Sequence, residues 1–229
     1  MRLATSVRTS LGIACSVAAM SSQAATMTLT TWEFGSGNIV NAGAPNYNGE
    51  AGGFAGTLTG AGPGFDTNSL YTYCVQLTNY FHWNTPNAVN VILASDYFAN
   101  NPLDGAGSGV GNTKAALLGK LFSYVEADPT RVDTSAESTA LQLAVWNIVY
   151  DTDLTLGSGT FKDTSSYAAA ANGFLSAASS YAGPLTQAVY VLDGAMQDQL
   201  IWRRIPEPTS AALVAVALFG LSFTRRRRA

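Results

Sequence analysis

The sequence predicts one α+β domain, in which short strands flank a central helical section. Two observations lead to this prediction. Segments rich in aromatic and β-branched residues lie before and after the middle of the chain, and apolar residues recur at three-to-four spacing within it. The domain is expected to span residues 25–205, between an N-terminal signal helix at 1–24 and a C-terminal transmembrane sorting helix in 206–229.

The first half of the domain has the composition of strands and loops. Residues 27–34 alternate enough to form a strand, and residues 35–64 are rich in Gly, Asn, Ala and Pro, which is typical of turns between short strands. Residues 69–83, rich in Tyr, Thr, Val, Phe and Trp, predict another strand with Cys74 at its centre. Residues 89–99 fit either type, with a weak preference for helix.

The second half predicts three helices, at 113–128, 134–150 and 164–182, and a closing hairpin formed by 187–193 and 197–203. The second helix has the clearest beginning. Thr134 and Glu137 have the spacing of a capping box, in which the hydroxyl accepts from a free backbone N–H and the carboxylate accepts from the cap residue.

The N-terminus has the features of an export signal. Arg2 and Arg8 precede an uncharged run over 9–20, and Ala24 completes a small-x-small cleavage pattern. We therefore expect residues 1–24 to be removed. Cys15 lies in the apolar run, so a lipid-anchored protein is an alternative, although the residues before it match the lipoprotein pattern poorly.

The C-terminus has three consecutive features. Pro206-Glu207-Pro208 is followed by an apolar stretch over 209–224 and then by the arginines 225–228. This order resembles the PEP-CTERM sorting signal of Gram-negative bacteria. The resemblance implies transient anchoring in the inner membrane, removal of the tail by an exosortase-type protease, and delivery to the cell surface or extracellular matrix. An ordinary single-pass anchor is the alternative.

The charge of the expected mature domain is acidic. The chain has 12 basic and 15 acidic residues, and the two termini hold six of the arginines and one glutamate, which leaves six basic against fourteen acidic residues in 25–205. This balance argues against a nucleic acid partner.

Cys74 is the only cysteine of 25–205, and a lone thiol in an oxidising compartment needs protection. Gln142 heads a partly apolar stripe of the second helix that continues through Val145, Trp146 and Val149. A buried amide there needs hydrogen-bond partners or a chemical role. A nearby thiolate would attack its carbonyl carbon, expel ammonia and leave a thioester.

Two short segments, Tyr73-Cys74-Val75-Gln76 and Leu141-Gln142-Leu143-Ala144-Val145-Trp146, resemble the thioester domains of bacterial surface adhesins. That family joins the cysteine of a Tyr-Cys-x-acidic motif to the glutamine of a Thr-Gln-x-Ala-x-Trp motif. The resemblance implies that Cys74 and Gln142 form the thioester crosslink and that Trp146 packs near it. Gln76 replaces the acidic residue and Leu141 replaces the threonine.

The resemblance implies a protein that reacts once with an amine or hydroxyl on a protein or polysaccharide and is not an enzyme. No cofactor is expected. Aromatic side chains near the two motifs are expected to keep water from the bond; they are Tyr71, Tyr73, Tyr80, Phe81, Trp83 and Trp146.

Several alternatives stay open. One alternative is a non-covalent structural or matrix-binding protein, whose thioester-like fold lacks the bond. A Cys74–His82 hydrolase needs a turn between the two residues, because eight extended residues span about 26 Å. A loop-built calcium site would draw on four carboxylates, Asp128, Asp133, Asp151 and Asp153, but their spacing is not that of an EF-hand, and no metal site is predicted.

Overall fold

The computed structural model describes residues 24–43, 46–100, 111–151 and 153–205. The strands are β1 (Ala24–Trp32), β2 (Asn38–Ala42), β3 (Tyr47–Ala51), β4 (Phe54–Thr59), β5 (Thr67–Cys74), β6 (Asn87–Leu93), β7 (Gln187–Gly194) and β8 (Gln199–Arg204). The helices are α1 (Ala94–Asn100), α2 (Gly111–Glu126), the short 3-10 helix η1 (Pro129–Arg131), α3 (Ser135–Tyr150) and α4 (Ala168–Ser180).

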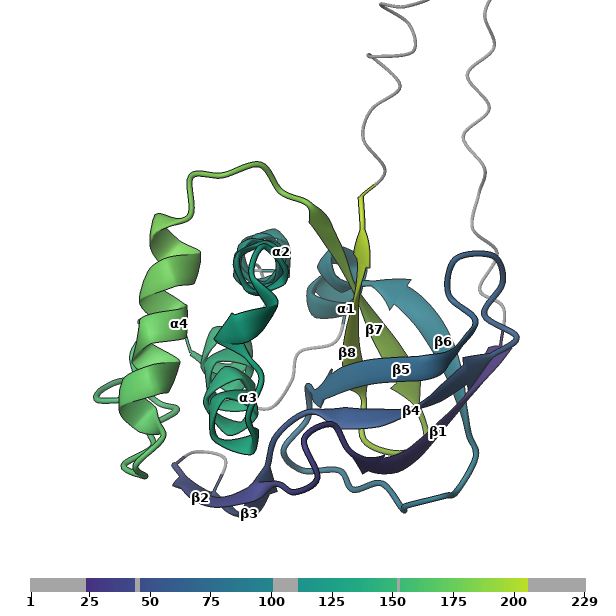
Figure 1. The fold of residues 1–229 in the computed structure, drawn as a ribbon, viewed down its shortest axis with the longest axis horizontal. Helices are drawn as coiled ribbons and strands as arrows, with labels where there is room; N and C mark the ends of the chain where they lie inside the picture. The colour runs from purple at the N-terminus through teal and green to yellow at the C-terminus, as the bar shows by residue number, and fades with distance from the viewer. Residues whose placement is uncertain (1–23, 44–45, 101–110, 152, 206–229) are drawn as a thin grey trace, which may run out of the picture.

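Six of the strands form a closed barrel in the order β1-β4-β5-β8-β7-β6, and β2 pairs with β3 in a separate sheet. Helices α2, α3 and α4 gather beside the barrel, with the β2–β3 sheet near one end of α3 (Figure 1). The seam between β5 and β8 is short: its paired residues are Tyr73 with Leu200 and Cys74 with Gln199. Cys74 therefore lies where the barrel closes.

The predicted α+β class is wrong, because the described residues form a closed β-barrel with helices packed against it. Strands that precede the helices in the chain pair with strands that follow them, within one sheet. β8 pairs with both β5 and β7, and β6 pairs with both β1 and β7. A local pattern indicates a strand but does not say which distant strand will pair with it, so closure was not visible in the sequence.

Two predicted elements before the helices need correction. The strand expected at 69–83 ends at Cys74, so this residue is the last of β5 and not its centre. The segment 89–99, for which helix was preferred, begins as β6 and becomes helical only from Ala94. Hydrogen bonds to β1 on one side and β7 on the other hold β6 extended, which overrides a weak helical preference.

The three predicted helices and the closing hairpin are confirmed, with shorter bounds for the last helix. The capping box of α3 is present: the Thr134 hydroxyl accepts from the Glu137 N–H, and the Glu137 carboxylate accepts from the Thr134 N–H. Every residue of α3 from Ser138 to Tyr150 is buried. The helix packs against α2, α4, β5 and the β2–β3 sheet, so a polar side chain near its middle must find partners inside the protein.

The predicted terminal helices lie almost entirely outside the described residues, which begin at Ala24 and end at Ile205. The sorting motif Pro206-Glu207-Pro208 lies outside them too. Among the helices that the structure does describe, none combines the length and the apolar character needed to cross a bilayer.

Replacing Gly56 by alanine is expected to lower the free energy of unfolding by about 1 to 3 kcal/mol. A Cβ at this position of β4 would lie 2.1 Å from the Thr28 carbonyl oxygen and 3.0 Å from Leu29 Cα, both in the backbone of β1. Urea denaturation measures the change. Gly173→Ala in α4 is the control, because nothing lies within 4 Å of its added Cβ, and it should be neutral or slightly stabilising. Equal stability of the two variants would contradict the close β1–β4 approach.

Candidate functional site

Cys74 is a free, buried cysteine at the end of β5. Only 1% of its surface is exposed. Its thiol donates a hydrogen bond to the Gln76 carbonyl oxygen, at a sulfur–oxygen distance of 2.7 Å. The next residue, Val75, donates its N–H to Asp198 at 2.9 Å, which continues the seam with the β7–β8 hairpin. The sulfur is thus held in a fixed place at the barrel closure.

Gln142 lies in the buried part of α3 and contacts Cys74 directly. Its Oε1 accepts from the Cys74 backbone N–H at 2.8 Å, and its Nε2 donates to the Cys74 carbonyl oxygen at 2.9 Å. These two residues are 68 positions apart in the sequence. The structure therefore brings together the two residues that the sequence motifs predict as partners.

The amide of Gln142 occupies the place of a missing strand. The pairing of β4 with β5 ends at Phe54 and Thr72, so β4 offers nothing to Cys74 two residues further along. A primary amide has one acceptor and two donors in the same plane, and therefore reproduces the pattern of a backbone peptide. The side chain of Gln142 satisfies both backbone groups of Cys74 on that side, which places its amide carbon beside the cysteine.

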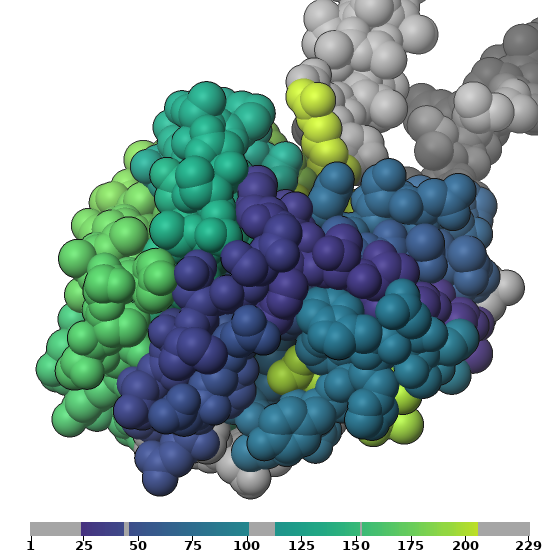
Figure 2. Space-filling model, turned by 60° about the horizontal axis from the view of Figure 1, so that its bottom comes forward, coloured from purple at the N-terminus to yellow at the C-terminus, as the bar shows by residue number. Residues whose placement is uncertain are grey.

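Cys74, Gln142 and Trp146 line one cavity of about 220 Å³. Most of its other walls are aromatic and come from four segments; these residues are Trp32, Tyr47, Phe54, Tyr80, Phe81 and Trp83. Glu50 and Gln197 add polar groups. Figure 2 looks onto this end of the molecule, where the segment after β5 lies beside the β2–β3 sheet and part of the C-terminal hairpin shows between them.

The aromatic walls pack on one another. The ring of Phe54 stacks on that of Trp32 at 4.7 Å between centroids, and Phe81 meets Trp83 edge-on at 4.7 Å. Trp32 and Phe54 come from the N-terminal segments, and the sequence analysis did not assign them to the site. For Phe54, an aromatic residue within a Gly-rich region was the available signal. The cavity thus limits the access of water to the Cys74–Gln142 pair.

The environment of Cys74 disfavours its thiolate. Burial raises the pKa of the thiol well above its ordinary value, and the negative charge of Asp198 raises it further. The Trp146 side chain and the Gln76 backbone act in the opposite direction and lower this pKa. The unreacted protein therefore holds a neutral thiol at physiological pH.

Gln76, at the acidic position of the adhesin motif, contacts the sulfur through its backbone and not through its side chain. Its amide faces away, where Oε1 accepts from the N–H of Asp198 at 3.4 Å and Nε2 approaches the Tyr97 hydroxyl at 3.5 Å. Burial raises the pKa of Asp198 to about 6, although Tyr97 donates to its carboxylate at 2.5 Å. A buried acid thus lies beside Gln76, on a hairpin distant in sequence.

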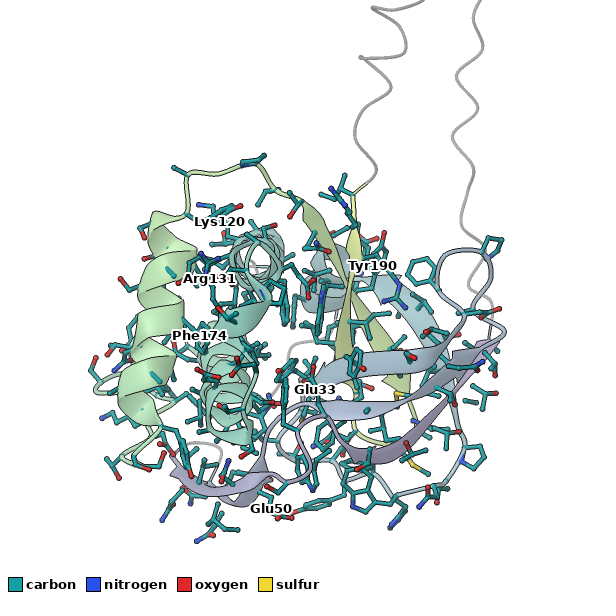
Figure 3. The ribbon with its side chains drawn as sticks, viewed as in Figure 1. Glu33, Glu50, Lys120, Arg131, Phe174 and Tyr190 are labelled. Atoms are coloured by element: carbon teal, nitrogen blue, oxygen red, sulfur yellow. The ribbon has the colours of Figure 1, made fainter. Side chains whose placement is uncertain are left out.

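Tyr73 lies on the other side of β5 from Cys74, as alternation along a strand requires. Its hydroxyl donates to Glu33 at 3.2 Å and lies 3.2 Å from the Ser138 hydroxyl. Tyr71, Tyr73 and Glu33 line a second cavity of about 280 Å³. Glu33 lies between the helices and the barrel (Figure 3). Tyr71 and Tyr73, expected to shield the Cys74 site, thus line a different cavity from that of Cys74.

The alternative sites of the sequence analysis have little geometric support. His82 is not among the residues that line the Cys74 cavity. Asp151 accepts from the N–H groups of Thr160 and Phe161, and Asp153 accepts from its own loop. Within the described ranges, no group of three or more His, Cys, Asp or Glu side chains is placed to hold a metal ion.

The chain was compared with protein-family models, with curated proteins and with solved structures. No family model, curated protein or solved structure matches this chain.

Proposed function

We propose that this chain is an exported surface protein that attaches itself covalently to its target through an internal thioester between Cys74 and Gln142. The observation that carries the proposal is the pair of hydrogen bonds, 2.8 and 2.9 Å long, that fixes the Gln142 amide against the Cys74 backbone. The aromatic cavity around the pair supports it, because a thioester needs protection from water.

The geometry supports the bond-forming step. The Cys74 sulfur attacks the amide carbon of Gln142, the carbon–nitrogen bond breaks, and the nitrogen leaves as ammonia with the proton of the thiol. The Cys74 N–H already donates to Oε1, where negative charge develops in the tetrahedral intermediate. The donor to the developing oxyanion is thus the backbone of the nucleophile itself.

The second step couples the protein to its target. An amine or hydroxyl attacks the carbonyl carbon, the carbon–sulfur bond breaks, and the nucleophile gives a proton to the departing sulfur. The product is an amide or ester on Gln142 and a regenerated Cys74 thiol. Each chain reacts once, so the protein acts without turnover and needs no cofactor.

The sequence signals at the two ends supply the cellular context of the proposal. Residues 1–24 would direct export, and residues 206–229 would hold the chain at the inner membrane until an exosortase-type protease removes them. The mature protein would then act at the cell surface or in the extracellular matrix. Its acidic balance supports a partner other than nucleic acid.

A second candidate is a non-covalent structural or matrix-binding protein that keeps this fold without the bond. One observation favours it. The Gln142 amide is satisfied by its two hydrogen bonds, and burial raises the pKa of the Cys74 thiol, so the unreacted pair is stable as it stands. The two candidates differ in covalent mass.

Intact mass spectrometry of the mature domain is expected to show a deficit of about 17 Da, the loss of one ammonia. Methylamine should then add to Gln142 and release a thiol that titrates. Cys74→Ala should restore the full mass, whereas Gln197→Ala should keep the deficit, because this residue lines the same cavity without taking part in the bond. Full mass together with a thiol that titrates before methylamine would exclude the covalent function and leave the non-covalent one.

A further inference from the structure

Trp146 carries an unexplained polar atom. Only 2% of the residue is exposed, and its indole Nε1 is buried without a hydrogen-bond partner. Leaving a buried donor unpaired costs about 1 to 3 kcal/mol. The indole is nevertheless fixed in place by Tyr47 at 5.1 Å and Phe161 at 6.3 Å between ring centroids. An orphaned donor held this firmly indicates that an acceptor is present in another state of the site.

The acceptor that fits is the sulfur of Cys74. Trp146 follows Gln142 by one helical turn, so both side chains project from the same face of α3 into the same cavity as Cys74. The Trp146 N–H lowers the pKa of the Cys74 thiol, which means that it favours the charged sulfur. A neutral thiol is a weak acceptor, whereas a thiolate is a strong one.

Other groups around the sulfur do not serve this purpose. The cavity walls include no lysine, arginine or histidine among the described residues. The hydroxyl of Tyr47 is engaged with the Glu50 carbonyl at 2.6 Å, and Nε2 of Gln197 donates to the Gln76 carbonyl at 2.9 Å. Asp198 opposes negative charge on Cys74. Among the residues that line the cavity, Trp146 is the one whose side chain lowers the pKa of the Cys74 thiol.

We propose that the Trp146 Nε1–H donates a hydrogen bond to the Cys74 sulfur as it departs with negative charge, and so promotes opening of the thioester by the target. The inference rests on the proposed function and adds a residue to it. In this step the amine nitrogen bonds to the Gln142 carbonyl carbon, the carbon–sulfur bond breaks, and the electron pair goes to sulfur. Trp146 keeps its own proton, and the sulfur takes the proton that the amine loses.

Trp146→Phe tests the proposal, because it removes the N–H and keeps an aromatic ring. Methylamine should open the thioester of this variant about tenfold to a hundredfold more slowly, as expected for a lost hydrogen bond to a charged group. In the opened protein the thiolate should form at higher pH, as followed by thiolate absorbance. Trp202→Phe is the control, since Trp202 does not line this cavity and its indole N–H donates to Glu126 at 2.7 Å; its rate and pH profile should match the wild type.

A second measurement uses the wild-type chain and does not depend on the folding of a variant. The indole N–H resonance of Trp146 should move as the Cys74 thiol of the methylamine-opened protein is ionised. If the Trp146→Phe rate and pH profile equal those of the wild type, or the resonance does not respond, the role of Trp146 is overturned. A wild-type protein with no thioester overturns the proposed function instead, and its free thiol then shows directly, by the same profile, whether Trp146 stabilises the thiolate.

Discussion

The Gln142→Leu variant is expected to have a free energy of unfolding about 2 to 6 kcal/mol lower than that of Cys74→Ala, in which no thioester forms and the Gln142 amide stays intact. Leucine fills much of the same space, but it leaves both the N–H and the carbonyl oxygen of Cys74 buried without the partners they have now. Each unpaired buried group costs about 1 to 3 kcal/mol. Urea denaturation of Gln142→Leu and Cys74→Ala measures this difference.

Cys74→Ala is the matched control for this effect, because it also removes the thioester. It keeps the backbone groups at position 74 and the amide that binds them, so its loss should be limited to the small side chain and the crosslink. The difference between Gln142→Leu and Cys74→Ala isolates the two hydrogen bonds. If the two variants unfold at the same urea concentration, the amide of Gln142 has no structural role beyond the thioester.

The stability of the domain is expected to fall by roughly 3 kcal/mol as the pH rises from about 4.5 to above 7, through the ionisation of Glu33. The pKa of Glu33 is raised from 4.5 to about 7, mainly by burial and to a smaller extent by Glu126, against an opposing hydrogen bond from Tyr73. The folded state therefore binds a proton that the unfolded state releases across this range. The stability that this proton contributes is fully present below the pKa of Glu33 in the unfolded state. It is lost as the pH rises through the pKa of Glu33 in the folded state. Asp198, with a pKa raised from 3.8 to about 6, acts in the same direction.

Glu33→Gln should remove the Glu33 part of this dependence and leave the part that Asp198 contributes, since the amide is neutral at every pH and can still accept from Tyr73. Urea denaturation at about pH 5 and about pH 8 compares the two proteins on either side of the transition. Glu50→Gln, at an exposed position, is the control. Its free energy of unfolding should differ between about pH 5 and about pH 8 by as much as that of the wild type. A Glu33→Gln protein with the full pH dependence would show that another group is responsible.

The central pair of the site was predictable because its chemistry is local to two short motifs. A lone cysteine in one motif and a buried glutamine in the other were enough to name Cys74 and Gln142, and the structure places them in contact. The orientation of Tyr73 was not predicted, although alternation along β5 separates it from its neighbour. Trp32, Phe54 and Asp198 lie near Cys74 but come from distant segments of the chain. No local sequence pattern indicates that these segments meet there.

The barrel was less accessible to sequence reasoning than its individual strands. The helices α2 and α3 were recognisable because the spacing of their apolar residues, and for α3 also its capping box, is encoded within each segment. The closure of the sheet depends instead on pairings such as Cys74 with Gln199, which join residues far apart in the chain. Strand periodicity carries no information about those partners, and a short seam of two residue pairs leaves little trace in composition.

The position of the proposed bond has a consequence for the lifetime of the protein. A Cys74–Gln142 linkage would join β5 to α3 and close a chain loop across 68 residues. By restricting the unfolded chain, a crosslink that closes such a loop stabilises the folded state by about 4 kcal/mol. Reaction with a target breaks this crosslink, which lies beside the short β5–β8 pairing. Proteases should therefore digest the reacted domain sooner than the unreacted one.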